Sequence, residues 1–354
     1  MTQPAAAAPD QIDIRPGHHA FGEPECTAVL RAVPADFQVT EILGFEPSDE
    51  GPHALLLVEK TGLNTLDLLP QIARAAGLRQ RDIGYCGLKD RHAVTRQWVS
   101  LPAQKANDSE QWTGEGWRVV ERRANQRKLR LGAHARNEFV LRLTDLEGNT
   151  DGLDARAESI RQHGVPNYFG EQRFGHDGDN LRRARRWFVD GAELARRQRR
   201  FALSAARSWL FNRVLSARVA ADQWRGPIEG EPLCLDGSRS FFMPKPEDAD
   251  DVARRLGEFD VHPSGPLWGK GESPALSTCG ELEAAVVASL PWLADGLAAE
   301  GLRQERRPLR LPVHDFNVEV AGTTLTATFA LAKGSFATAV VHELARVNGG
   351  RILA

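Results

Sequence analysis

The sequence lacks the motifs of several common enzyme classes. No GxGxxG, GxxxxGKS/T, GxSxG or HExxH pattern occurs in its 354 residues, so a dinucleotide site, a P-loop, a hydrolase elbow and a zinc protease site all lack support. Cysteine is scarce too: Cys26, Cys86, Cys234 and Cys279 lie far apart and form no CxxC pair. Such thiols are typical of a reducing cytoplasm. We therefore expect no metal and no cofactor, so any chemistry must come from side chains alone.

Long apolar runs are missing as well. No stretch approaches the roughly 18 residues that a membrane span needs. The start, MTQPAAAAPD, has no basic region followed by an apolar one, as a signal peptide would. We therefore expect a cytoplasmic protein with no membrane partner, whose residues 1–12 form a disordered tail.

The net charge is only −2, but the charges are segregated along the chain. Segments 122–136, 181–187 and 196–200 are rich in arginine and hold no acidic residue, whereas acids gather in 246–251. Such segregation creates local positive fields that can bind phosphates. A single arginine run is as often a solvated helix face. Three runs together favour a polyanionic partner.

Strand-type sequence flanks a helical middle. Apolar, strand-like runs predict strands within 35–61, and short β-rich segments follow between 82 and 143, with a helix over 64–77 between them. Helical spacing dominates from 153 to about 310, and a hairpin pattern returns at 316–331. We infer an α+β protein in which both chain ends build one mostly antiparallel sheet domain, interrupted by an inserted helical domain.

Asp90 is the best single candidate for chemistry. In the stretch GYCGLKDRHAVTRQ (84–97), Lys89 and Arg91 flank it, and Gly87 permits close backbone approach. Neighbouring cations favour an ionised carboxylate, which can serve as a nucleophile or a base. The alternative is an exposed aspartate in a turn or at a helix cap, and the spacing alone favours that alternative.

Two further stretches allow two interpretations each. The GSF sequence at 334–336 precedes a predicted helix whose free amides can hold a phosphate, but Phe336 can also simply pack against Val340 and Leu344. The loop GVPNYFGEQRFGHDGDN (164–180) either presents aromatic faces and Arg173 to nucleotides or forms a structural hinge.

Several blocks resemble the tRNA pseudouridine synthase D family. The stretches GLKDRHAVTRQ, GVPNYFGEQRFGHDGDNL, LSAARSWLFNRVLSARV, GLRQERRPLRL and KGSFATAVVHEL look like its successive signature blocks, in family order, and the match covers almost the whole chain beyond the tail. The resemblance implies a pseudouridine-synthase-like, mixed and mostly antiparallel sheet domain, residues 1–163 plus 312–354. A helix-rich α/β TRUD domain is then inserted over 164–311.

The resemblance also implies an activity. Members of this family are tRNA-modifying isomerases that convert uridine to pseudouridine, in bacteria at position 13 and notably in glutamate tRNA. They need neither cofactor nor metal, and likeness to them implies a cytoplasmic monomer. The alternative is a non-catalytic tRNA-binding or folding chaperone that keeps the fold, and an intact set of catalytic residues argues against it.

The family's functional positions fall on particular residues of this sequence. The resemblance implies a catalytic Asp90, supporting roles for Arg31 and Lys89, and substrate contacts from Phe37, Asn137, Phe139 and Phe336. Arg31 matches the basic position expected to pair with the aspartate. Whether Asp90 attacks carbon or removes a sugar proton stays open.

Overall fold

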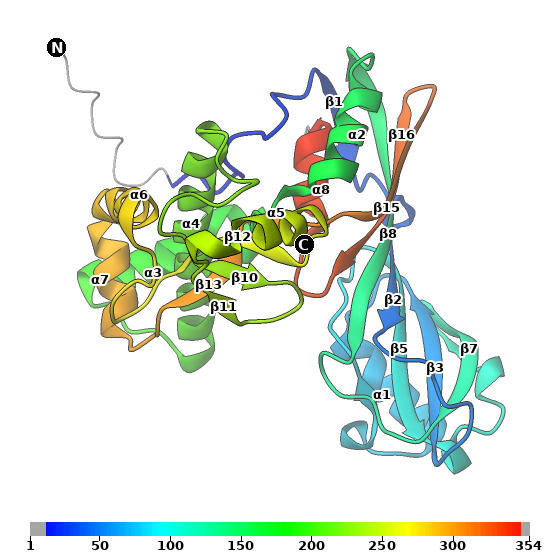
Figure 1. The fold of residues 1–354 in the computed structure, drawn as a ribbon. Coiled ribbons are helices and arrows are strands. Elements are labelled where there is room, and N and C mark those ends of the chain that lie inside the picture. The colour runs from blue at the N-terminus through cyan, green and yellow to red at the C-terminus, as the bar shows by residue number, and fades with distance from the viewer. Residues whose placement is uncertain (1–11, 348–354) are drawn as a thin grey trace. The chain divides into compact units, whose positions relative to one another are not determined.

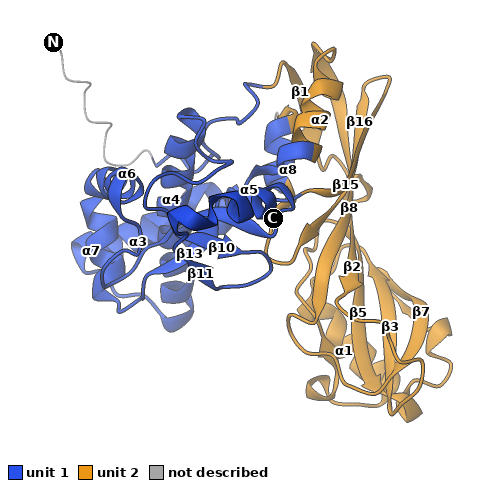
Figure 2. Cartoon of the chain, in the orientation of Figure 1, with its two compact units in different colours: residues 1–23, 162–312, 338–343 blue, residues 24–161, 313–337, 344–354 orange. Residues whose placement is uncertain are grey.

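The structure, a computed structural model, describes residues 12–347 (Figure 1). All but the last residue of the predicted N-terminal tail lies outside the described residues. The chain forms two compact units, coloured separately in Figure 2. The first unit holds the described residues up to 23, with 162–312 and 338–343, and the second holds 24–161, 313–337 and the described residues from 344 onward.

Two segments group differently from the predicted domains. Residues 12–23 and 338–343 belong to the first unit, which contains the predicted insertion, whereas the sequence analysis assigned both to the sheet domain. In the first unit, Ser216 Oγ accepts the His18 N–H at 3.2 Å, and the Tyr168 hydroxyl donates to the His18 carbonyl at 3.1 Å. These contacts span 198 and 150 residues of sequence. No local pattern predicts such pairings.

The second unit is built on one mixed sheet. Its elements are β1 (Cys26–Leu30), β2 (Phe37–Leu43), β3 (His53–Lys60), α1 (Thr65–Ala76), β4 (Gly84–Tyr85), β5 (Val94–Pro102), β6 (Thr113–Gly114), β7 (Trp117–Asn125), β8 (His134–Gly148), β15 (His314–Ala321), β16 (Thr324–Ala332) and β17 (Arg346–Val347). The strand order is β15-β16-β8-β2-β5-β3-β7-β6, with β1 beside β8 and β17, and β4 beside β5. Within the described part of this sheet only β2–β5 and β1–β17 pair in parallel, which confirms the predicted mixed, mostly antiparallel sheet.

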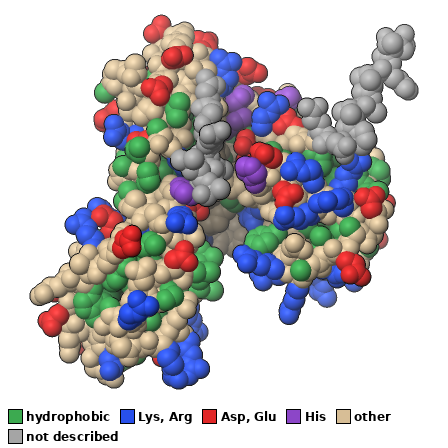
Figure 3. Space-filling model, turned by 180° about the vertical axis from the view of Figure 1, so that it is seen from behind, with side chains coloured by type: hydrophobic (Ala, Val, Ile, Leu, Met, Phe, Trp, Pro, Cys, Tyr) green, Lys and Arg blue, Asp and Glu red, His purple; other side chains and the backbone are tan. Residues whose placement is uncertain are grey.

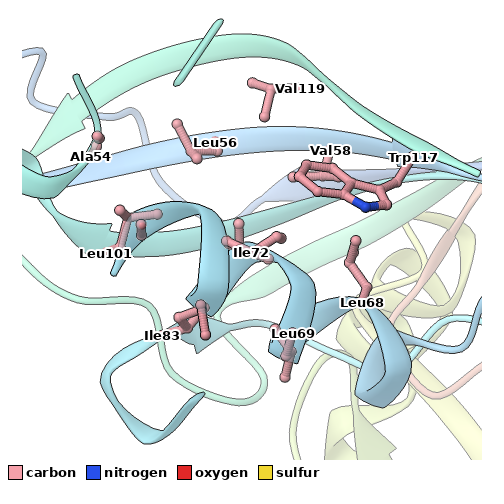
Figure 4. Packing of buried hydrophobic residues seen from close by; sticks show 14 residues of the cluster. Ala54, Leu56, Val58, Leu68, Leu69, Ile72, Ile83, Leu101, Trp117 and Val119 are labelled. Atoms are coloured by element: carbon pink, nitrogen blue, oxygen red, sulfur yellow. The ribbon is translucent and has the colours of Figure 1, made fainter. Parts of the chain in front are cut away.

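Helix α1 packs on the sheet face made by β3, β5 and β7 (Figure 4). Leu68, Leu69 and Ile72 of the helix, and Leu56 and Val58 of β3, are at most 1% exposed. Burying each such side chain stabilises the fold by about 1.5–3 kcal/mol. The helix was predicted over 64–77, and the structure confirms it, with Asn64 at the N-cap and Gly77 at the C-cap.

The first unit is richer in helices. Its elements are β9 (Val165–Pro166), α3 (Asp179–Asp190), α4 (Arg196–Ala220), β10 (Leu233–Leu235), β11 (Phe241–Phe242), α5 (Ala249–Gly257), β12 (Val261–Leu267), α6 (Ser277–Ala288), α7 (Pro291–Ala299), β13 (Glu305–Pro308) and β14 (Arg310–Leu311). Helix α4 packs against α3, α7 and β12, and the small sheet runs β11-β10-β12-β13. Helices α2 (Leu153–His163) and α8 (Ala337–Leu344) each contain residues of both units.

No helix of the described chain is by itself long and apolar enough to cross a membrane. As a pair, α6 and α7 pass the same test of length and composition, although they are bent by 99° at the break between them.

Candidate active site

Asp90 lies in the segment between β4 and β5, where its carboxylate meets a buried cation. The Asp90 side chain is 57% exposed, and Arg31 Nη2 lies 3.6 Å from Asp90 Oδ2. The Arg31 side chain is only 11% exposed, and its guanidinium lies 3.7 Å from the centre of the Phe37 ring. Burial lowers the pKa of Arg31, and the charge of Asp90 opposes that shift. The carboxylate thus faces outward from a cation that the protein holds in place.

The backbone at Arg31 is in an unusual conformation. Its φ of 62° lies in the left-handed region, which costs a residue with a Cβ roughly 1–2 kcal/mol. Residue 31 directly follows β1, so this turn sets the direction in which the guanidinium leaves the strand. Strained backbone of this kind clusters at functional sites.

The cations flanking Asp90 in sequence are directed elsewhere. Lys89 Nζ lies 2.9 Å from Glu41 Oε1 and donates to Asn137 Oδ1 at 2.5 Å. Arg91 Nε donates to the Gly62 carbonyl at 2.9 Å. The expectation that Lys89 and Arg91 hold the carboxylate between them is therefore wrong, because each of these side chains binds a different partner. Arg31 supplies the charge instead.

Glu41 is a member of the site that the sequence analysis missed. Its side chain is fully buried, and Oε2 accepts the Trp98 N–H at 3.0 Å. Burial raises the pKa of Glu41, and the Lys89 ammonium lowers it in turn. A signal was present, since the alternation of β2 places Glu41 on the same buried face as Phe37 and Val39.

The predicted aromatic residues come together on neighbouring strands. Phe37 on β2 meets Phe139 on β8 edge-to-face, with ring centres 6.1 Å apart. Phe139 also stacks on Phe329 of β16 at 5.3 Å, a residue that the sequence analysis did not select. Phe37 and Phe139 are 4% and 7% exposed, so each offers only part of its ring to a ligand, and the Arg31 guanidinium lies over Phe37.

Gly87 allows the close approach that its position predicted. A Cβ at residue 87 would lie 3.1 Å from His134 Cε1 and 3.3 Å from Glu41 Oε1. Burial lowers the pKa of His134 to about 4, with Lys89 and Lys333 adding to the shift. A neutral imidazole therefore packs beside this segment.

None of the contacts described above involves Phe336, the remaining predicted substrate contact. It lies between β16 and α8 and is half-buried. The structure thus brings together Arg31, Phe37, Lys89, Asp90, Asn137 and Phe139, through the ion pairs, hydrogen bond and ring contacts above.

In the first unit, the aromatic loop 164–180 has its rings inside the protein. Tyr168, Phe169 and Phe174 are 1%, 5% and 0% exposed. Arg173 lies over the Phe169 ring at 5.1 Å and donates to Ser204 Oγ at 2.9 Å. Of the two interpretations of this loop, the structure favours the structural hinge.

One group of described side chains has the composition of a metal site. His19, His342 and Glu343 of the first unit have potential ligand atoms within 4.8 Å of one another. The two imidazoles are stacked, with ring centres 3.9 Å apart and planes 18° apart. Nearly parallel rings direct their nitrogen lone pairs side by side, whereas a bound ion needs them to converge. The arrangement does not suit a shared ion.

Comparison with known proteins agrees with this geometry. The chain matches the sequence model described as tRNA pseudouridine synthase D (TruD) over residues 17–191 and 179–344. The tRNA pseudouridine synthase D of Methylococcus capsulatus is 46% identical over 331 residues, covering 92% of this chain and 93% of that protein. That of Stutzerimonas stutzeri is 48% identical over 338 residues, covering 94% and 97%.

A solved structure shares the fold. The crystal structure from Methanosarcina mazei, described as a tRNA pseudouridine synthase D, superposes with a TM-score of 0.78 at 21% identity, over 95% of this chain and 97% of that one. The fold is therefore that of a pseudouridine synthase. The chain belongs to the tRNA pseudouridine synthase D family, which confirms the resemblance seen in its sequence blocks.

Proposed function

We propose that this protein isomerises uridine to pseudouridine at position 13 of tRNA, notably glutamate tRNA, with Asp90 as the catalytic residue. The observation that carries the proposal is the exposed Asp90 carboxylate 3.6 Å from a buried Arg31 guanidinium, beside the Phe37 ring. A carboxylate placed in this way is aimed at a ligand arriving from solvent. The same proposal has the enzyme acting in the cytoplasm, as a monomer.

The reaction requires the target base to leave its stack. Isomerisation breaks the bond between uracil N1 and ribose C1′ and forms one between C5 and C1′, while a proton leaves C5 and N1 ends with a proton. Neither bond is accessible inside folded RNA, so the uridine must be flipped out first. Asp90 starts the cleavage, either by attack on carbon or by removal of a sugar proton. The exposed parts of the Phe37 and Phe139 rings contact the base while it rotates.

The contact with Lys89 determines which end of the Asn137 amide is left for the substrate. A lysine ammonium has donors and no acceptor, so the atom 2.5 Å from Lys89 Nζ is the amide oxygen of Asn137. The NH2 group is what remains for the ligand. It donates to an acceptor on the uridine, such as a base carbonyl or a sugar oxygen.

The arginine-rich segments supply the affinity for the RNA backbone. Arg122, Arg130 and Arg136 of the second unit are exposed, as is the whole of 196–200 at the start of α4 in the first unit. Lys and Arg side chains lie open to solvent on both units on the face shown in Figure 3. Contacts with phosphates release counterions, so we expect tRNA affinity to fall steeply with salt.

The test uses unmodified glutamate tRNA, incubated with the wild type and with Asp90→Asn. Pseudouridine is mapped by base-resolved chemical probing, and tRNA binding is measured in parallel. A signal at position 13 from the wild type alone supports the proposal. Binding by the wild type without modification favours the chaperone alternative and refutes a catalytic Asp90.

A further inference from the structure

The connection from the last residue of β3 to the first residue of α1, residues 60–65, binds the backbone on both sides of Asp90. Lys60 Nζ donates to the Asp90 carbonyl at 2.8 Å and to the Leu63 carbonyl at 2.6 Å. One residue earlier, the Lys89 N–H donates to Thr65 Oγ1 at 2.8 Å. We call residues 60–65 the 60–65 turn.

The 60–65 turn also forms hydrogen bonds with the residue that follows the aspartate, Arg91. The Gly62 N–H donates to the Arg91 carbonyl at 3.1 Å, and Arg91 Nε donates back to the Gly62 carbonyl at 2.9 Å. Thr65 is itself fixed, since its hydroxyl donates to Gln97 Oε1 at 2.8 Å inside the core. The backbone of three consecutive residues, 89–91, is thus tied to one short turn.

Burying the Lys60 side chain here costs free energy of desolvation. It is 1% exposed, and burial lowers its pKa to about 8. An apolar side chain of similar volume would avoid the desolvation of an ammonium group. Lysine provides what such a side chain cannot, a compact donor able to bind two carbonyls at once. The bond to Asp90 is therefore a specific reason for a lysine at this position.

We propose that the 60–65 turn, acting through Lys60 and Thr65, positions Asp90 for catalysis. This inference rests on the proposed function of Asp90. The Asp90 side chain is 57% exposed and meets Arg31 only at 3.6 Å, so packing does little to fix it. Its location follows from its backbone, and the 60–65 turn sets that backbone. A displacement of about 1 Å at a reacting group can cost about 100-fold in rate.

The pH dependence of the reaction rate distinguishes a positioning role of Lys60 from a purely structural one. The charges acting on its ammonium come from Asp90, Lys89 and Asp67, whereas Thr95 and Trp117, its neighbours on β5 and β7, carry none. When the pH rises above about 8, Lys60 loses its proton and binds both carbonyls less strongly. If it positions Asp90, the single-turnover rate of the wild type falls through that range. A structural role changes stability and leaves the rate of the folded enzyme flat.

The experiment compares the wild type, Lys60→Met and a matched control, Val58→Ala. Val58 lies two residues earlier on β3, is fully buried, and belongs to the hydrophobic cluster between the sheet and α1. Single-turnover rates on glutamate tRNA, tRNA affinity and thermal unfolding are measured for each. We expect Lys60→Met to react about 100-fold more slowly than the wild type with unchanged affinity for tRNA. Its rate should no longer fall as the pH rises through about 8. Val58→Ala should lose stability but keep its rate.

Each outcome decides a separate point. A Lys60→Met rate equal to that of Val58→Ala overturns the positioning role while leaving the proposed function intact. A wild type that forms no pseudouridine overturns the proposed function itself, and this inference with it. If Lys60→Met does not fold, Thr65→Val removes the acceptor of the Lys89 N–H with little change in shape. A slower rate at unchanged affinity then supports the inference, and an unchanged rate overturns it.

Discussion

Replacing Lys89 by methionine should destabilise the protein strongly and in a pH-dependent way. Lys89 and Glu41 form an ion pair at 2.9 Å in which the side chains are 7% and 0% exposed. Without Lys89, the Glu41 carboxylate stays in the core without its counter-charge, keeping only the Trp98 N–H among the hydrogen bonds described above. Removing one partner of a buried pair typically costs about 3–5 kcal/mol in the free energy of unfolding.

The pH dependence follows from the direction of the Glu41 shift. Burial raises the pKa of Glu41 above its ordinary value of 4.5, with Lys89 opposing. A raised carboxyl pKa means that the folded chain binds the proton more tightly than the unfolded chain. That contribution is present below pH 4.5 and is lost as the pH rises through the folded value. Removing Lys89 raises the pKa of Glu41 in the folded chain further. The free energy of unfolding lost in Lys89→Met should therefore be largest at pH 7 and above and should shrink towards pH 4.5.

Urea unfolding followed by tryptophan fluorescence, at pH 5 and pH 8, measures this loss. The double variant Glu41→Gln/Lys89→Met should recover most of it, because a neutral amide can still accept the Trp98 N–H. Lys245→Met is the matched control, since its pairing with Glu247 at 3.9 Å is 72% and 68% exposed and should matter little. A loss for Lys89→Met below about 1 kcal/mol, or an equal loss at both pH values, would refute the reasoning.

Two further predictions concern the RNA. Arg31→Met should lower the single-turnover rate about 100-fold with little change in tRNA affinity, since it removes the cation 3.6 Å from Asp90; a rate equal to that of the wild type would rule out a role for this ion pair. Arg130→Ala, at an exposed position, should weaken tRNA binding and reduce the slope of log affinity against log salt by about 1. Filter binding between 50 and 200 mM salt, as is usual for such measurements, gives that slope, and an unchanged slope would place Arg130 away from the RNA.

The sequence indicates the sheet more readily than it indicates the site. The alternation along β2, the apolar run of β3 and the hairpin of β15 and β16 are local patterns that depend on burial. Asp90 and Arg31, by contrast, are 59 positions apart in sequence, and no period relates them. The family resemblance supplied that pair, together with Phe37 and Asn137. The sequence neighbours of Asp90 led to a wrong prediction of which cations face its carboxylate, because Lys89 pairs with Glu41 instead.

Lys60 shows why part of the site escapes prediction. A lysine at the end of a strand usually has a solvated ammonium, and nothing in its neighbours suggests otherwise. Its burial depends on an acceptor 30 residues further along the chain, the Asp90 carbonyl. Glu41 is different, since its place on the buried face of β2 marks it as unusual from sequence alone. A buried charge is recognisable by pattern, whereas its purpose depends on which partner the fold brings to it.

The two lysines divide the support of Asp90 between them. Lys60 holds the backbone carbonyl of the aspartate, and Lys89 reaches past it to fix Glu41 and Asn137. In the described residues neither ammonium forms an ion pair with the carboxylate, although the charge of Asp90 acts on Lys60 at longer range. The carboxylate is 57% exposed and meets Arg31 at 3.6 Å. In the reaction that we propose, a closer lysine would compete with the ribose for the same oxygen atoms. The structure therefore supports the aspartate from its backbone and leaves its side chain open. The reaction that we propose, on a large flipped nucleotide, requires such an arrangement.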